Sequence, residues 1–186
     1  QEASNAADSA MVAVVKLPPE KVEELAGQFD QVYPVNYNSP AQTVCAGLSS
    51  SMDGLKAAVK AAGGRALPLK VGGAFHSPFM SSAAKGLAEV LAPMEFGTPS
   101  CPLYSNVTAQ PYEDGQFKDL LSRQVENPVR WQTIVENMIA AGVDTFIEVG
   151  PGKTLAGLIG KINSDVRALN VEDAESLKHT IEEVKA

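Results

Sequence analysis

Residues 10–72 alternate between strand-like and helix-like runs in a fixed order, and this order constrains the fold most. Four short apolar runs read as strands because turn-forming residues bound them: residues 11–16, 32–37, 43–46 and 65–71. One predicted helix opens at Pro18-Pro19 after the first strand, and a second ends at Gly63-Gly64 before the last. A turn at Asn38-Ser39-Pro40 joins the two middle strands. The order β-α-β-β-α-β predicts a ferredoxin-like subdomain.

Residues 73–186 mix helices with few strands. Apolar spacing of three and four residues predicts helices over residues 80–91, 117–121, 131–138, 155–162 and 174–184. The strands we expect are 103–107, a buried one at 145–149 and an edge strand at 167–171. These are too few to build the central sheet of an α/β domain. The sequence therefore predicts an α/β protein in which residues 73–186 form only part of a second subdomain.

Composition excludes several classes of partner. The formal net charge is −7, which argues against nucleic acid, since phosphate binding needs clustered Lys and Arg. No apolar stretch is long enough to span a bilayer, and residues 1–10 lack the apolar segment of a signal peptide. We expect a cytoplasmic protein. Cys45 and Cys101 are widely spaced without a metal-binding pattern, so we expect two reduced core cysteines and no metal or other bound cofactor.

A histidine between a glycine-rich segment and a proline is the first candidate for a catalytic residue. His76 lies in Gly72–Met80, whereas the chain's other histidine, His179, lies in a charged helix-like segment. A histidine held at a turn can carry protons near neutral pH. The alternative from local spacing is a packed or surface histidine. No G-x-S-x-G elbow occurs in the sequence, so a serine nucleophile for His76 would lie outside these residues.

The run Gly152-Lys153-Thr154 looks like the end of a phosphate-binding loop. The full motif G-x-x-x-x-G-K-[ST] needs a glycine where this chain has Ile147. Without that glycine the loop cannot wrap its amides around a phosphate chain. We interpret the run as a tight strand-to-helix turn bent by Pro151 and its neighbouring glycines.

Four segments resemble one enzyme family in the same order along the chain: Val35–Gln42, Gly73–Met80, Arg123–Trp131 and Glu148–Lys153. They are similar to motifs of the malonyl-CoA:acyl carrier protein transacylases, acyltransferases of fatty acid and polyketide synthesis. The resemblance covers the C-terminal part of the family's chain, somewhat over half of it. The family's nucleophilic serine, oxyanion-hole glutamine and carboxylate-binding arginine would fall before Gln1. The chain thus looks like a fragment, with residues 73–186 as the C-terminal part of an α/β-hydrolase-like acyltransferase domain.

The resemblance implies a mechanism with two catalytic residues from this chain. A serine of the missing N-terminal half attacks malonyl-CoA, and malonyl then passes to the phosphopantetheine thiol of acyl carrier protein. His76 corresponds to the general base that such a serine requires. The main-chain carbonyl of Gln124 corresponds to the acceptor that orients it. Taken alone, Gln124 reads as a polar residue at a helix end.

Two further residues are implied at the substrate. Phe75 precedes the histidine, and in similar modular acyltransferases A-F-H goes with malonyl whereas A-S-H goes with methylmalonyl. Asn38 matches an asparagine that lines the family's active site. Without the resemblance, Phe75 reads equally well as core and Asn38 as a turn residue. We expect the chain alone to be inactive, and the alternative function is a non-catalytic ferredoxin-like interaction domain.

Overall fold

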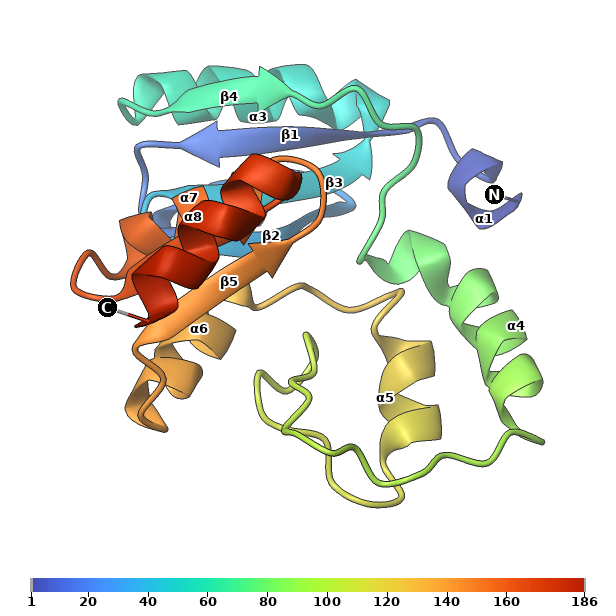
Figure 1. Cartoon of the computed structure of the whole chain (residues 1–186). Helices are drawn as coiled ribbons and strands as arrows, with labels where there is room; N and C mark the ends of the chain where they lie inside the picture. Colours follow the sequence, from blue (N-terminus) through green and yellow to red (C-terminus); the bar gives the residue numbers. More distant parts are fainter. Residues whose placement is uncertain (1, 186) are drawn as a thin grey trace. The chain divides into compact units, whose positions relative to one another are not determined.

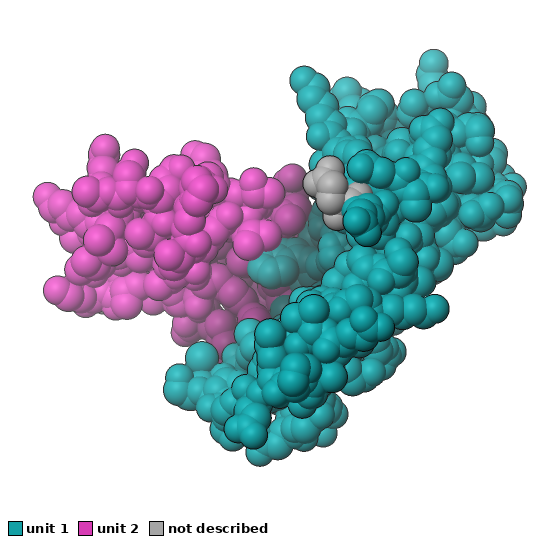
Figure 2. All heavy atoms as spheres, turned by 90° about the vertical axis from the view of Figure 1, so that its right-hand side faces the viewer, with its two compact units in different colours: residues 1–134 teal, residues 135–186 magenta. Residues whose placement is uncertain are grey.

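The computed structural model describes residues 2–185, and the chain forms two compact units, residues 1–134 and 135–186 (Figure 2). The boundary between the units falls within helix α6 (Trp131–Ala140). Each unit has its own sheet, with four strands in the first and two in the second. The boundary that the sequence predicts near Gly72 is a finer division inside the first unit, and it stays a prediction.

The sheet of the first unit is antiparallel throughout, with strand order β2-β3-β1-β4 (Figure 1). Its elements are β1 (Ser9–Val15), α2 (Pro19–Ala26), β2 (Val32–Ser39), β3 (Gln42–Leu48), α3 (Ser49–Ala61) and β4 (Arg65–Pro68). A short helix, α1 (Glu2–Asn5), precedes β1. The element order predicted for residues 10–72 is confirmed.

Helices α2 and α3 pack on the sheet through the apolar stripes seen in the sequence. Val22 and Leu25 of α2 and Leu55 and Val59 of α3 join strand residues such as Val14 in one buried cluster. Helix α3 ends as predicted at Gly63-Gly64, because Gly63 N donates to Lys60 O and Gly64 N to Val59 O. Gly63 has φ 85°, a left-handed conformation that glycine adopts without strain.

Two details of this sheet differ from the sequence prediction. Strand β2 continues through Asn38 and Ser39, and the turn consists of Pro40 and Ala41 alone. Two register irregularities in the β2–β3 pairing give β2 the extra residues that lengthen it. Strand β4 ends at Pro68 instead of residue 71, and one further backbone bond, from Leu69 N to Met11 O over 3.0 Å, follows it.

The chain then returns over the sheet and packs on it. Ala74 is buried in a second cluster with strand residues such as Val35 and Val44, and Phe75 and Phe79 pack against that cluster. The elements that follow are η1 (Pro78–Met80), α4 (Ser81–Leu91) and α5 (Phe117–Arg123), of which α4 and α5 lie side by side (Figure 1).

The strand predicted at residues 103–107 is wrong. This segment forms a tight turn in which Ser105 N donates to Gln110 O and Ala109 N donates to Ser105 O, each over 2.9 Å. An isolated bridge between Tyr104 and Pro111 closes its base, where Tyr112 N donates to Leu103 O over 2.8 Å. Hydrogen bonds within the turn satisfy the backbone groups that a strand would have offered to a sheet. Cys101 lies in the preceding loop and is exposed, so the prediction of a core cysteine is also wrong there.

The second unit contains a parallel pair, β5 (Thr145–Val149) and β6 (Arg167–Val171), linked by α7 (Thr154–Ile162) and followed by α8 (Ala174–Lys185). Strand β5 is not the buried strand that we expected, since the Val149 side chain is 80% exposed. In the described chain β5 has one neighbouring strand, and the other edge stays open. No helix within residues 2–185 is long and apolar enough to cross a membrane.

Candidate active site

His76 sits in a strained turn that is anchored on both sides. Its φ is 60°, in the left-handed region that few residues other than glycine occupy. Ala74 before it is buried in the sheet cluster, and the buried Ser77 after it donates from Oγ to Ala74 O over 2.6 Å. Gly73 approaches Ser4 so closely that an added Cβ would lie 2.6 Å from the Ser4 Cβ. The turn therefore holds the half-buried imidazole in one direction.

The imidazole contacts the main chain at the end of helix α5. His76 Nδ1 lies 2.9 Å from the carbonyl oxygen of Gln124. A carbonyl can only accept, so Nδ1 carries the proton of this bond and Nε2 is left as the acceptor. Gln124 is the C-cap of α5, where carbonyls have no partner within the helix. The contact that the sequence resemblance implies between these two residues is present.

The segment that follows Gln124 is tied to distant parts of the first unit. Val129 N donates to Val35 O over 2.8 Å, and Tyr37 N donates to Val129 O over 2.9 Å, which fixes the segment to β2. Ser81 Oγ donates to Glu126 Oε2 over 2.6 Å at the start of α4. His76 N also donates to Val125 O over 3.2 Å. The turn with His76 and the segment after Gln124 therefore form one connected structure.

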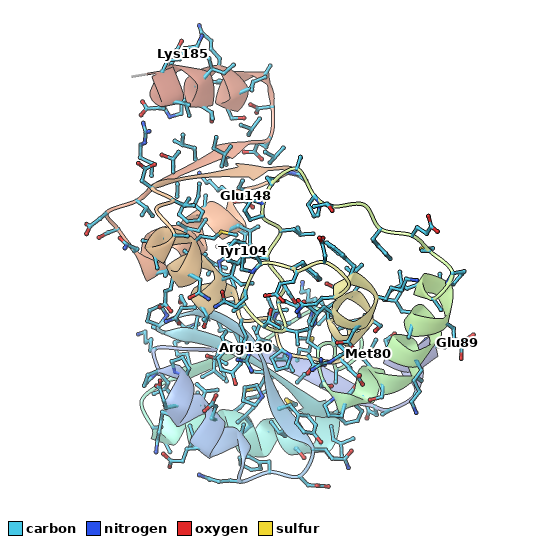
Figure 3. All side chains as sticks on the ribbon, turned by 90° about the horizontal axis from the view of Figure 1, so that it is seen from below. Met80, Glu89, Tyr104, Arg130, Glu148 and Lys185 are labelled. Carbon is cyan, nitrogen blue, oxygen red and sulfur yellow. The ribbon has the colours of Figure 1, made fainter. Side chains whose placement is uncertain are left out.

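Figure 3 shows the side chains of this region from below. Met80 ends η1, Arg130 directly precedes α6, and Tyr104 lies at the base of the turn described above. The segments that carry these three labelled residues all belong to the first compact unit.

Phe75 and Asn38 have different surroundings. Phe75 is half-buried and packs against the sheet cluster next to His76. Asn38 is half-buried near the end of β2, within the strand. Among the described residues, no hydrogen bond joins the Asn38 side chain to His76 or Gln124. The structure brings together His76, Phe75 and the Gln124 carbonyl, and it ties Asn38 to them only through β2.

A polar cleft lies beside the same segment, lined among others by Glu23, Tyr37 and Arg130. The Tyr37 hydroxyl donates to Glu23 Oε1 over 2.7 Å. Burial, and then this hydrogen bond, raises the pKa of Tyr37 above its ordinary value. Tyr37 is therefore a neutral hydrogen-bond donor at physiological pH and stabilises the link between α2 and β2.

Sequence reasoning missed two residues that organise this site. Glu126 accepts the Ser81 hydrogen bond, and the Asn106 side chain donates to main-chain carbonyls around Gln124. Asn106 falls in a run of turn-forming residues, which is the one local signal that could have excluded the strand predicted there. Glu126 lies in the segment Arg123–Trp131, but the resemblance gives its side chain no role, and each of the two residues acts on a segment distant in the sequence.

Known proteins match this chain over nearly its whole length. The malonyl CoA-acyl carrier protein transacylase of Bacillus subtilis (strain 168) is 35% identical over 190 residues, which cover 99% of this chain and 60% of that protein. The crystal structure of the corresponding transacylase from Clostridium perfringens ATCC 13124 matches with a TM-score of 0.95 and 38% identity, over 100% of this chain and 60% of that chain.

A third match is a complex. Its title describes a type II PKS acyl-carrier protein in complex with its malonyl-transacylase, and it matches with a TM-score of 0.93 and 38% identity, over 98% of this chain and 61% of that chain. The chain thus spans about three fifths of the length of these relatives.

The mixed α/β architecture matches that of the solved transacylases along the entire chain. The sequence resemblance to malonyl-CoA:acyl carrier protein transacylases is therefore confirmed. The acyl transferase domain matches residues 2–186, and the chain belongs to this family.

Proposed function

We propose that the chain is the part of a malonyl-CoA:acyl carrier protein transacylase that supplies the general base. The enzyme would transfer malonyl from malonyl-CoA to the phosphopantetheine thiol of acyl carrier protein through an acyl-serine. The 2.9 Å hydrogen bond from His76 Nδ1 to the Gln124 carbonyl supports this role most directly. A proton held on Nδ1 leaves the Nε2 lone pair available to take a proton from serine.

The chemistry proceeds in two transfers. In the first, Nε2 of His76 takes the serine proton while the serine oxygen attacks the thioester carbonyl. Nε2 then gives that proton to the sulfur of coenzyme A, which leaves as the thiol. In the second, Nε2 takes the proton of the carrier-protein thiol, whose sulfur attacks the acyl-serine, and the proton returns to the serine oxygen. A neutral carbonyl at Nδ1 fixes the tautomer and stabilises the imidazolium that forms in each step.

The nucleophile would come from residues other than these 186. No G-x-S-x-G elbow occurs in this sequence, and about two fifths of the relatives' length lies outside the match. The N-terminal half of the enzyme is therefore a proposed partner, and with it the oxyanion hole and the group that pairs with the malonyl carboxylate. Acyl carrier protein is the second proposed partner, which the complex of the similar transacylase supports.

We assign substrate contacts to Phe75 and Asn38. Phe75 is fixed by the sheet cluster and precedes His76, so part of its half-buried ring can form a wall of the acyl pocket. A rigid ring there would crowd a methyl branch at C2 of the acyl group and favour malonyl. Asn38 would offer its side-chain amide from β2, which is hydrogen-bonded to the segment that follows Gln124.

The same proposal divides the fold. Residues 10–72 would form a ferredoxin-like subdomain, which the β-α-β-β-α-β order and the antiparallel strand order β2-β3-β1-β4 support. Residues 73–186 would form the C-terminal part of an α/β-hydrolase-like catalytic subdomain, which the parallel pair β5 and β6 supports. A non-catalytic interaction domain remains the second candidate, favoured by the absence of a serine elbow.

Complementation tests the proposed function. The chain is combined with the N-terminal half of a similar transacylase, fused or as a second polypeptide, and malonyl transfer to carrier protein is measured. We expect activity, and we expect His76→Ala to lower kcat by about a thousandfold or more. His179→Ala is the matched control and should leave kcat unchanged, because His179 lies in α8 and has no proposed role. A near-normal rate for His76→Ala would remove His76 from the mechanism and favour the interaction domain.

A further inference from the structure

We propose that Asn106 is a positioning residue for His76, acting through the main-chain carbonyl of Gln124. This inference rests on the proposed role of His76 as the base. It assigns a function to a side chain that lies outside the segments resembling the transacylase motifs.

One side-chain nitrogen of Asn106 lies within hydrogen-bond distance of three main-chain carbonyl oxygens. Its Nδ2 donates to the oxygens of Pro128, Gln124 and Asn127 over 3.2, 3.4 and 3.5 Å. An amide nitrogen has two hydrogens, so three acceptors can share them only if all three carbonyls point toward Asn106. The Asn106 main-chain oxygen also accepts from Arg130 N over 3.4 Å. Asn106 therefore contacts the segment after α5 at both of its ends.

The turn that carries Asn106 is rigid. Ser105 and Ala109 on either side are fully buried. Ser105 N donates to Gln110 O, Ala109 N donates to Ser105 O, and Val107 N donates to Ser105 Oγ. The side-chain amide of Asn106 thus extends from a fixed platform, which lets it impose a direction on the carbonyls that it contacts.

The Gln124 carbonyl needs such a constraint. It lies at the C-cap of α5, where helix ends fray and the last carbonyls lack partners within the helix. Its oxygen has two lone pairs, of which His76 Nδ1 uses one and Asn106 Nδ2 approaches the other. Without Asn106, this carbonyl would lose a donor that aims it at the imidazole. The preference of His76 for the Nδ1-protonated tautomer should then weaken.

NMR signals of the two ring nitrogens of His76 show directly which nitrogen carries the proton. A His179→Gln variant of the full chain leaves His76 as its one histidine, and ¹⁵N-histidine NMR near pH 8 then distinguishes the two neutral tautomers. We expect mainly the Nδ1-protonated form in this parent. Adding Asn106→Ala should raise the Nε2-protonated fraction and speed exchange of the Nδ1 proton with water by about tenfold, the loss of roughly one hydrogen bond's constraint.

Asn127→Ala is the matched control on the same segment. Asn127 Nδ2 donates to Arg123 O over 2.8 Å, so this variant also removes a bond from a side-chain amide to a carbonyl, but one that spares Gln124. It should leave the His76 signals as in the parent. Unchanged His76 signals in Asn106→Ala, or equal changes in both variants, would overturn the proposal.

A second variant covers the case in which Asn106→Ala does not fold, as judged by circular dichroism. Asn106→Ser keeps a single short donor and should give an intermediate tautomer ratio. Unfolding of both variants would overturn the proposal, because Asn106 would then be required for the fold and not for the orientation of the Gln124 carbonyl.

The outcome is separable from that of the proposed function. In the complemented enzyme, Asn106→Ala should lower kcat roughly tenfold to a hundredfold, the effect of a slightly misplaced base, with KM for malonyl-CoA nearly unchanged. If His76→Ala kept full activity, the proposed function would fail while the NMR result on His76 would stand. If His76→Ala abolished activity and Asn106→Ala changed neither kcat nor the NMR signals, only the role of Asn106 would fail.

Discussion

His76 donates from Nδ1 to the carbonyl of Gln124 over 2.9 Å, although 48 residues separate the two in the sequence. Both residues belong to the first compact unit, and so do Asn106, Glu126 and Ser81, which fix the surrounding segments. The proposed base and its acceptor therefore form within one unit of this chain. The sequence contains no G-x-S-x-G elbow, and this observation leads to the first prediction.

The chain by itself should not become acylated. Incubation with radiolabelled malonyl-CoA, followed by denaturing electrophoresis, should leave the polypeptide unlabelled, because the sequence has no serine elbow. A full-length transacylase serves as the positive control. A label on this chain that survives denaturation would contradict the prediction and reveal a nucleophile within residues 1–186.

Phe75→Ser should relax substrate choice in the complemented enzyme. Removing the ring opens space beside the proposed acyl pocket. Accommodating one methyl group is worth about 1–3 kcal/mol, so the ratio of kcat/KM for malonyl over methylmalonyl should fall roughly tenfold to a hundredfold. Phe79→Ser is the matched control, since Phe79 packs against the same cluster and contacts Tyr33 edge to face. It should reduce stability without changing the ratio. An unchanged ratio in Phe75→Ser would make Phe75 a core residue only.

Thr43→Val should stabilise the first unit. Thr43 is fully buried in β3, and its Oγ1 has no hydrogen-bond partner within the described residues. Valine has nearly the same shape and no hydroxyl to desolvate, so the free energy of unfolding should rise by about 1 kcal/mol. Ser77→Ala should do the opposite by a similar amount, because the buried Ser77 hydroxyl donates to Ala74 O over 2.6 Å. Urea unfolding followed by circular dichroism measures both, and a loss of stability in Thr43→Val would be contrary to expectation.

The two cysteines should differ in reactivity. Burial raises the pKa of Cys45 to about 12, whereas Cys101 is exposed. The thiolate is the reactive form, so at pH 8 a thiol reagent should modify Cys101 rapidly and Cys45 only after unfolding. The raised pKa also means that Cys45 favours the folded state most below its ordinary value near 9, and that this contribution is lost as the pH rises toward 12. Mass spectrometry of native and urea-treated protein would show the order of modification, and early labelling of Cys45 would disprove its burial.

Much of the local structure could be predicted from the sequence because apolar spacing reports directly on helices and strands. Helix α3, which the Gly63-Gly64 turn follows, and strand β5 at residues 145–149 lie where the pattern places them. The strand predicted at 103–107 failed because hydrogen bonds within a turn, which no hydrophobic pattern reports, satisfied its backbone. The prediction that β5 is buried was wrong because the burial of a strand depends on its neighbouring strands and not on its own residues.

How much of the candidate site could be predicted depended on whether a residue belongs to a local sequence pattern. Local spacing marked His76 as a histidine at a turn, but its contact with Gln124 came only from the resemblance to a family. The run of turn-forming residues around Asn106 did not indicate its contacts with Gln124, Asn127 and Pro128, because these partners are main-chain carbonyls, which every residue possesses. Contacts from side chain to backbone over long sequence separations are invisible to motifs and become visible only in the fold.

The second unit should be the less stable part of the chain. Its sheet has two parallel strands, and two-stranded sheets have marginal stability without further strands or cover. Apolar side chains on β5 and α8 face outward, among them Val149, Ile181 and Val184. The four-stranded sheet of the first unit instead has a buried apolar cluster with α2 and α3 and a second one with the Phe75 segment.

Amide hydrogen exchange on a dilute sample, shown by sedimentation to be monomeric, tests this difference. Amides of β1 and β3 should exchange at least about a hundredfold more slowly than those that close the β5–β6 pair, because local opening of the smaller sheet breaks fewer contacts. Suitable probes in the smaller sheet are Gly150 N, which donates to Val171 O, and Arg167 N, which donates to Asp144 O, each over 2.9 Å. Addition of the N-terminal half of a similar transacylase should slow exchange at these two amides if it covers the open edge of β5. Equally slow exchange in both units of the isolated chain would show that the parallel pair is stable without a further strand.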